Sequence, residues 1–145
     1  MSPNAAATVF FIGLALSVAT VILVTIRRSP YRPAQAVLYT VNLLLTRLLW
    51  RAHVPKSLPI PLGQGAVMVA NHRSSVDPFF VQLAAKRVVH WMVAKEYVQH
   101  VILGWFLCTV EVIPTNRWGM DTAATRKTIR LASQGNVVGV FPEGR

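Results

Sequence analysis

The stretch "AVMVANHRSSVDP", residues 66–78, contains the features that decide the fold. A short apolar run, typical of a buried strand, leads into a polar loop and then into Asp77 and Pro78, a pair typical of a helix start. A strand followed by a loop and a helix is the repeating unit of α/β domains. We therefore expect Asp77 to be the N-cap of a helix, Pro78 its first residue, and His72 to lie in the loop at the end of the strand.

The same alternation continues through the rest of the sequence. Apolar, β-branched runs predict strands, and the amphipathic or apolar stretches between them predict helices. The predicted strands are 66–70, 88–94, 109–113 and 137–141, and the predicted helices are 78–87, 97–107 and 122–133. This order predicts an α/β domain with a largely parallel sheet, which we assign to residues 66–145. Because the sequence stops directly after a strand, we expect this domain to be truncated at its C-terminus.

Upstream of this domain, residues 5–26 form an uncharged stretch of 22 residues. As a helix it would be about 33 Å long, enough to cross the apolar core of a bilayer. A cleaved signal peptide is the alternative, but no basic region precedes the stretch, which is also long for a signal. We expect residues 1–28 to be an uncleaved transmembrane anchor. The basic residues that follow predict an inner or cytoplasmic membrane, with the α/β domain on the cytoplasmic side.

Residues 29–65 connect the anchor to the domain. Within them, apolar residues recur at helical spacing over 34–51, which predicts an amphipathic helix. The helix either lies in the membrane interface, the interpretation we favour because Trp50 and Arg51 stand at its end, or packs on the domain core. Prolines and glycines at 55–65 break the pattern and indicate a connector.

The formal charge of +10 would in a soluble protein first suggest a nucleic-acid partner. However, residues 1–76 hold seven basic residues and no acidic ones, and six of the seven lie within 27–56, directly after the apolar stretch. This placement is typical of a segment held against anionic lipid headgroups, so we expect membrane lipids rather than nucleic acid as the partner. The single cysteine, Cys108, excludes an internal disulfide framework, and we expect it in the apolar core.

His72 and Asp77 are the first candidates for chemistry. On a regular helix, residues five apart point about 140° away from each other, so only a loop could bring these two together. A carboxylate that holds one imidazole nitrogen orients the other as a base, which could then take a proton from a substrate hydroxyl. The alternative is a purely structural role, in which Asp77 only caps a helix and His72 is a polar loop residue.

Two further clusters follow the ends of other predicted strands. Glu143 and Arg145 lie in "FPEGR", and Arg117 ends "VIPTNR". Because the ends of parallel strands meet at one edge of a sheet, these side chains are expected near His72, where arginine could bind a phosphate through its planar fork of donors. Taken singly, each arginine would more often be a solvated surface charge.

These segments resemble the motifs of the glycerolipid acyltransferases typified by 1-acyl-sn-glycerol-3-phosphate acyltransferase. "NHRSSVDP" resembles the first motif, N-H-x4-D, and "FPEGR" resembles the third. "VIPTNR" is similar to the second motif, and "MVAKEYV" to the segment that lies between the first two. The resemblance covers residues 66–145.

The resemblance implies roles by position. His72 would be the general base that activates the acceptor hydroxyl, with Asp77 orienting it. The acceptor phosphate would be bound or its site supported by Arg117, Glu143, Gly144 and Arg145. The implied reaction transfers a fatty acyl group from acyl-CoA or acyl carrier protein to lysophosphatidic acid, giving phosphatidic acid for phospholipid synthesis. No metal or other cofactor is implied.

Some features leave alternatives open. The acidic residue common before the second-motif arginine is Asn116 here, Arg145 follows Gly144 directly, and a fourth motif is missing. The acceptor could instead be glycerol 3-phosphate or another lysophospholipid, or the chain could be a non-catalytic fragment that binds membrane lipid. A phospholipid hydrolase is disfavoured because the sequence has no G-x-S-x-G nucleophile elbow.

Overall fold

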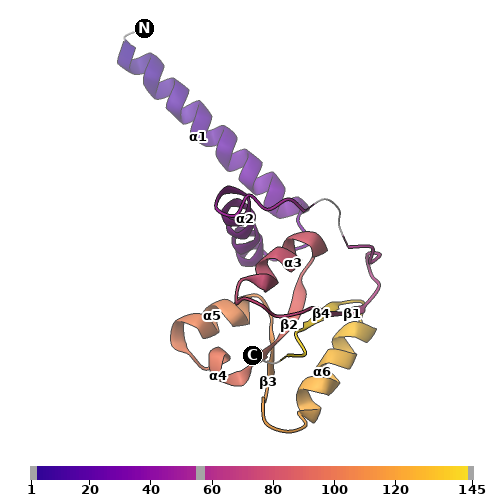
Figure 1. Cartoon of the computed structure of the whole chain (residues 1–145). Coiled ribbons are helices and arrows are strands. Elements are labelled where there is room, and N and C mark those ends of the chain that lie inside the picture. Colours follow the sequence, from indigo (N-terminus) through magenta and orange to yellow (C-terminus); the bar gives the residue numbers. More distant parts are fainter. Residues whose placement is uncertain (1–2, 55–57, 144–145) are drawn as a thin grey trace.

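The computed structural model describes residues 3–54 and 58–143. Its first helix, α1 (Pro3–Arg28), projects away from the rest of the chain, and the shorter α2 (Pro33–Leu48) lies against the domain that follows (Figure 1). The segment from Ala5 to Arg28 is long and apolar enough to cross a membrane, and its apolar stretch is exposed along its length. The two predicted N-terminal helices are therefore both present.

The rest of the chain is an α/β domain built on a parallel four-stranded sheet. The strands are β1 (Ala66–Val69), β2 (Val89–Ala94), β3 (Ile113–Thr115) and β4 (Val137–Val140), in the spatial order β1-β4-β2-β3. The helices between them are α3 (Asp77–Ala85), α4 (Lys95–Val98), α5 (Val101–Thr109) and α6 (Thr122–Ser133). This confirms the predicted fold class.

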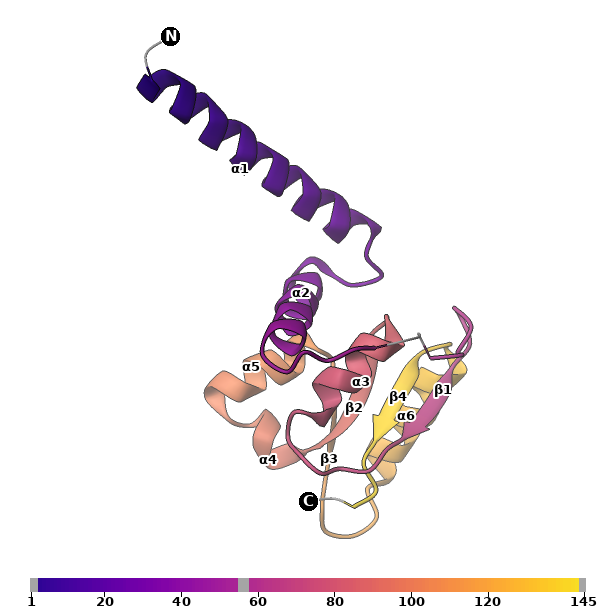
Figure 2. The ribbon, with the colours of Figure 1, turned by 45° about the horizontal axis from the view of Figure 1, so that its top comes forward.

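Helices cover both faces of the sheet (Figure 2). Successive side chains along β4 point to opposite faces and divide the core in two. Val137 packs with Val89, Trp91 and Leu107 on the face covered by α3 and α5. Val138, the next residue, packs on the opposite face with side chains that include Ala124 of α6. Both valines are fully buried, so β4 forms the centre of the domain.

Helix α2 packs on the domain through a side that contains most of its buried polar residues. Gln35 and Thr46 are buried, and the Asn42 side chain donates a hydrogen bond to the Phe79 carbonyl at 2.9 Å. Leu38 and Tyr39 also face the domain, where they line a small cavity with Phe79 and Phe106. Five large apolar residues of the helix are exposed instead: Val37, Val41, Leu44, Leu45 and Leu48. A helix face whose large apolar side chains are exposed, as here among the described residues, is typical of a helix in a membrane interface.

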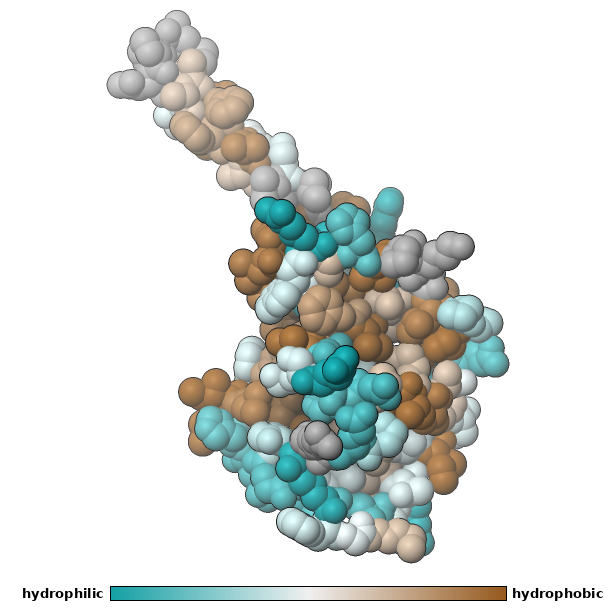
Figure 3. Space-filling model, viewed as in Figure 1, coloured by the Kyte–Doolittle hydropathy of each residue, from teal (hydrophilic) through white to brown (hydrophobic). Residues whose placement is uncertain are grey.

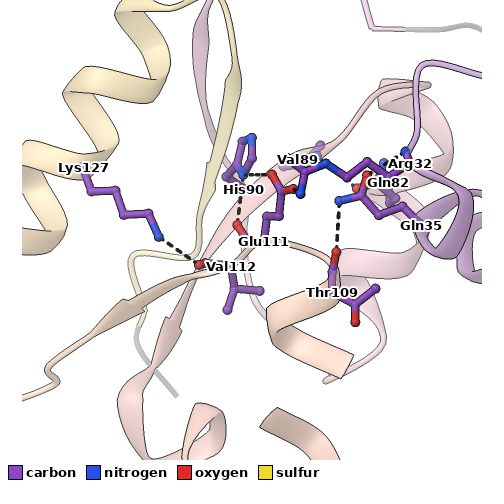
Figure 4. A network of polar contacts seen from close by, with 9 residues as sticks. All are labelled: Arg32, Gln35, Gln82, Val89, His90, Thr109, Glu111, Val112 and Lys127. Atoms are coloured by element: carbon purple, nitrogen blue, oxygen red, sulfur yellow. Dashed lines mark hydrogen bonds and ion pairs between the residues drawn. The ribbon is translucent and has the colours of Figure 1, made fainter. Parts of the chain in front are cut away.

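A small polar network holds the start of α2 to the domain (Figure 4). Arg32 forms an ion pair with Glu111 at 2.8 Å, and the Gln35 side chain donates to the Thr109 carbonyl at 3.0 Å. Nδ1 of the buried His90 lies 2.9 Å from the carbonyl oxygen of Glu111. The turn after α5 is thus bound by Arg32 and Gln35 at the start of α2 and by His90 of β2.

Three expectations about the middle of the chain were wrong in detail. The strand predicted at 109–113 lies at Ile113–Thr115, because α5 extends to Thr109 and Glu111 then adopts a left-handed backbone, φ 57°, that turns the chain. The helix predicted at 97–107 is divided into α4 and α5, with His100 as the N-cap of α5. Cys108 is exposed rather than in the core, because α5 buries Gly104 and Leu107 instead.

Candidate active site

His72 lies in the loop that joins β1 to α3, as the sequence predicts, and its ring is directed towards Asp77. Nδ1 of His72 is 3.4 Å from Oδ2 of Asp77, and the two side chains are 20% and 26% exposed. This separation is longer than the usual hydrogen-bond length of about 2.9 Å. Nδ1 is itself buried and has no hydrogen-bond partner among the described residues. The two side chains are therefore in contact without forming a hydrogen bond of ordinary length.

The Asp77 carboxylate holds the loop rather than capping the helix. Its Oδ2 accepts hydrogen bonds from the backbone N–H groups of Arg73 and Ser74, at 2.7 and 2.8 Å. The N-cap of α3 is Val76, with no side-chain cap, so the expectation that Asp77 is the N-cap was wrong. The reason is that the loop turns its N–H groups towards the carboxylate. Asp77 thereby closes the loop around His72.

These contacts lower the pKa of the Asp77 carboxyl below its ordinary value of 3.8, chiefly through the Ser74 N–H, with further contributions from the Arg73 N–H and the neighbouring His72. A depressed pKa means that the ionised carboxylate favours the folded state. The resulting stability is fully present above the ordinary pKa and is lost as the pH falls through the folded-state pKa. Asp77 is thus expected to stay ionised at any pH near neutrality.

An acid titration of stability tests this. We expect the difference in free energy of unfolding between the native protein and Asp77→Asn to be larger at neutral pH than at a pH below 3.8. Denaturant unfolding in detergent at a series of pH values measures it. Asp121→Asn should behave in the same direction, because the Ala124 and Asn116 N–H groups lower the pKa of Asp121. A difference that does not change with pH would contradict the assignment.

An aromatic ring stacks on the face of the imidazole, and a second ring stacks on the first. The rings of His72 and Phe141 are stacked, with centroids 4.3 Å apart and an interplanar angle of 26°. Phe141 in turn stacks on Trp91 at 4.5 Å and 4°. His72 therefore packs on Phe141, which follows β4, and Phe141 is backed by Trp91 of the neighbouring strand β2.

Arg117 lies in the loop that follows β3. Its guanidinium carbon is 5.3 Å from the centroid of the Tyr97 ring, a cation–π contact. The loop is anchored by Asp121, whose carboxylate accepts from the backbone N–H of Asn116 at 2.8 Å and from that of Ala124 at 2.9 Å. The position of Arg117 is thus fixed by the loop and by Tyr97.

One cavity of about 1160 Å³ brings several of the predicted residues together. His72, Arg117 and Glu143 all line it, and Asp77 adjoins it through His72. Its other walls are largely apolar, with Phe79, Leu103, Phe106, Leu107 and Val110 among them. The two remaining predicted residues, Gly144 and Arg145, lie outside the residues that the structure describes. In the described parts of the chain, no three His, Cys, Asp or Glu side chains are grouped so as to hold a metal ion.

This site can be compared with known proteins. A protein-family model described as "Acyltransferase" matches residues 51–145. The chain belongs to the acyltransferase family. It is also 28% identical over 86 residues to the 1-acyl-sn-glycerol-3-phosphate acyltransferase of Bacillus subtilis (strain 168). That match covers 59% of this chain and 43% of the relative, so the chain spans less than half of the relative's length. No solved structure matches the chain.

For a member of the acyltransferase family, the site contains residues that sequence reasoning missed. Tyr97 contacts Arg117, and Asp121 anchors the loop that carries Arg117. Trp91 lines the cavity and stacks on Phe141, the ring that packs on His72. None of the three was a predicted site residue. One signal was present for Trp91: Gly139 interrupts the apolar strand "VVGVF", and a glycine inside a strand often marks the close approach of another group.

Proposed function

We propose that the chain transfers a fatty acyl group from an acyl thioester, acyl-CoA or acyl carrier protein, to the free hydroxyl of lysophosphatidic acid, giving phosphatidic acid. The observation that carries the proposal is the contact between His72 and Asp77 in a cavity that also has an arginine and a long apolar wall. The site has a base, a cation and an apolar surface, and the proposed acceptor has a hydroxyl, a phosphate and a fatty chain.

The base in this reaction is His72. Its Nδ1 faces the Asp77 carboxylate, which favours the tautomer with the proton on Nδ1 and leaves Nε2 free to accept a proton. As Nε2 takes the proton of the acceptor hydroxyl, the oxygen attacks the thioester carbonyl and forms the new C–O bond. The C–S bond then breaks, and the imidazolium returns its proton to the leaving thiolate. Asp77 stabilises the imidazolium between these two steps.

The acceptor phosphate is assigned to Arg117. Its guanidinium rests on Tyr97 at the cavity wall, where it has no carboxylate partner among the described ion pairs. A guanidinium donates paired hydrogen bonds to a phosphate. Glu143 supports this end of the cavity, and we extend the assignment to Gly144 and Arg145 on the family resemblance alone.

The apolar wall suits a fatty chain. Burial of each CH2 group contributes about 0.8 kcal/mol, so several carbons against Phe79, Phe106 and Leu103 would supply substantial binding energy. On this proposal the length of the wall limits the length of the acyl chain that is accepted.

We also propose that the protein works at a membrane, with α1 as its anchor and α2 in the interface. The exposed apolar face of α2 supports this, as do Val101, Ile102 and Trp105, exposed on α5. Figure 3 shows apolar side chains along α1 and again at the edge of the domain formed by α5. Arg27 and Arg28 at the end of α1, with Arg32 just after it, favour the cytoplasmic side for the domain.

The choice of acceptor tests the proposed function. Membranes that contain the protein are incubated with labelled acyl-CoA and one of three acceptors: lysophosphatidic acid, glycerol 3-phosphate, or monoacylglycerol, which lacks the phosphate. We expect lysophosphatidic acid to be acylated with the highest kcat/KM, and Arg117→Gln to reduce its advantage over monoacylglycerol. Equal use of monoacylglycerol by the native protein would refute phosphate recognition. A higher kcat/KM for glycerol 3-phosphate would mean that glycerol 3-phosphate, rather than lysophosphatidic acid, is the acceptor.

The membrane anchor leads to a prediction about extraction. Native protein should remain in membranes washed with alkaline carbonate, whereas a variant with Leu14→Arg and Ile22→Arg should be extracted, because each arginine near the centre of a spanning helix costs about 2.5–3.5 kcal/mol. Ile129→Arg, which replaces an exposed apolar side chain of α6, is the control and should remain bound. Immunoblots of pellet and supernatant measure the outcome. Extraction of the native protein would contradict the anchor.

A further inference from the structure

For His72 to meet an acceptor hydroxyl, its ring must be held in one plane, and Asp77 alone does not hold it. The contact between the two side chains is 3.4 Å long, and Nδ1 has no hydrogen-bond partner among the described residues. Oδ2 of Asp77 already accepts two backbone hydrogen bonds, from Arg73 and Ser74. The orientation of the ring therefore depends on other contacts.

Those contacts come from a stack of three rings. His72 follows β1, Phe141 follows β4, and Trp91 lies in β2, the three strands that are adjacent in the sheet (Figure 2). Phe141 lies between the other two, 4.3 Å from His72 and 4.5 Å from Trp91. The Trp91 and Phe141 rings are almost parallel, at 4°, and His72 departs from Phe141 by only 26°.

Gly139 provides the space for this stack. Trp91 is the direct register partner of Gly139, so its indole lies across β4 at the one position that has no side chain. A Cβ atom at position 139 would be 2.5 Å from Cζ3 of the indole, far inside normal contact distance. Phe141 comes directly after β4 and two residues after Gly139, so its ring lies on the same face of the sheet, where the indole over Gly139 stacks on it.

We propose that Trp91 is a positioning residue for His72, seated over Gly139 and acting through Phe141 to fix the plane of the imidazole. The proposal rests on the proposed function in one respect, the role of His72 as base. Trp91 also lines the cavity, but most of the cavity wall is formed by other residues, so loss of the indole should misalign the base and affect mainly kcat. A misplacement of about 1 Å can reduce a rate by about 10²-fold.

Kinetics of acyl transfer test the proposal in membranes that contain the full chain. Trp91→Leu and Gly139→Ala should lower kcat about tenfold to hundredfold with KM changed less than about threefold, and Trp91→Phe, which keeps a ring, should restore most of kcat. Val137→Ala is the matched control, since Val137 is fully buried in the same cluster as Trp91 but does not line the cavity. It should lower stability and leave kcat unchanged. A Trp91→Leu variant with native kcat, or with a loss no larger than that of Val137→Ala, would overturn the proposal.

A second measurement does not depend on activity. In detergent, with 13C-labelled histidine, the ring protons of His72 should be shifted upfield by the face of Phe141, and His72→Ala assigns the signal. The shift should disappear in Phe141→Leu, decrease in Trp91→Leu and persist in Val137→Ala. If the native protein shows this pattern but transfers no acyl group, the stack stands and the proposed function fails. If transfer occurs and Trp91→Leu leaves the shift unchanged, the positioning role is refuted.

Discussion

Replacement of His72 by alanine is expected to lower kcat for acyl transfer to lysophosphatidic acid by about 10²–10⁴-fold, because the acceptor hydroxyl then loses its base. The KM for the acceptor should change little, since the proposed function assigns the phosphate and the fatty chain to other parts of the cavity. Initial rates with labelled acyl-CoA measure both constants.

His53→Ala is the control for this variant. His53 is exposed, contacts only the Arg51 carbonyl among the described contacts, and does not line the cavity. It should transfer acyl groups at the native rate. If His72→Ala were as active as His53→Ala, the assignment of the base would be wrong.

Replacement of Asp77 by asparagine is expected to have the second largest effect, a loss in kcat of up to about 10⁴-fold. The amide has nearly the same shape, and its oxygen can still accept from the Arg73 and Ser74 N–H groups, so the loop should persist. What is lost is the negative charge beside Nδ1, which selects the tautomer of His72 and stabilises the imidazolium.

Glu111→Gln is the matched change from acid to amide for this experiment. Glu111 pairs with Arg32 and lies outside the cavity lining, so this variant should keep native kcat. Circular dichroism checks that both variants are folded. A native rate for Asp77→Asn would mean that the carboxylate only holds the loop.

The sequence predicts the parts of this structure that depend on local pattern. The apolar run before His72 is strand β1, and the alternation of strands and helices does produce a parallel sheet. The loop position of His72 also follows from sequence, because Pro78 favours a helix start and limits where the chain can turn. Residues at three strand ends do line one cavity, as the edge of a parallel sheet requires.

What the sequence does not predict depends on partners that are distant along the chain. Asp77 looks like a helix cap, and only the folded loop shows its carboxylate bound to the Arg73 and Ser74 N–H groups. Trp91 reads as an ordinary strand residue until the order of the strands places it opposite Gly139. Helix α2 is amphipathic by pattern, but which of its faces meets the domain is decided by specific bonds such as that from Asn42 to the Phe79 carbonyl.

The measurement that tests the central claim most directly is product formation from lysophosphatidic acid and acyl-CoA with a 13C-labelled acyl chain. The native protein in membranes is incubated with both substrates. The lipid products are identified by mass spectrometry, and the amount of free CoA is measured with a thiol reagent. We predict phosphatidic acid that carries one labelled chain, in equal amount to the free CoA and strongly reduced in His72→Ala. Release of CoA with labelled free fatty acid and no labelled phosphatidic acid, or no reaction at all, would contradict the account.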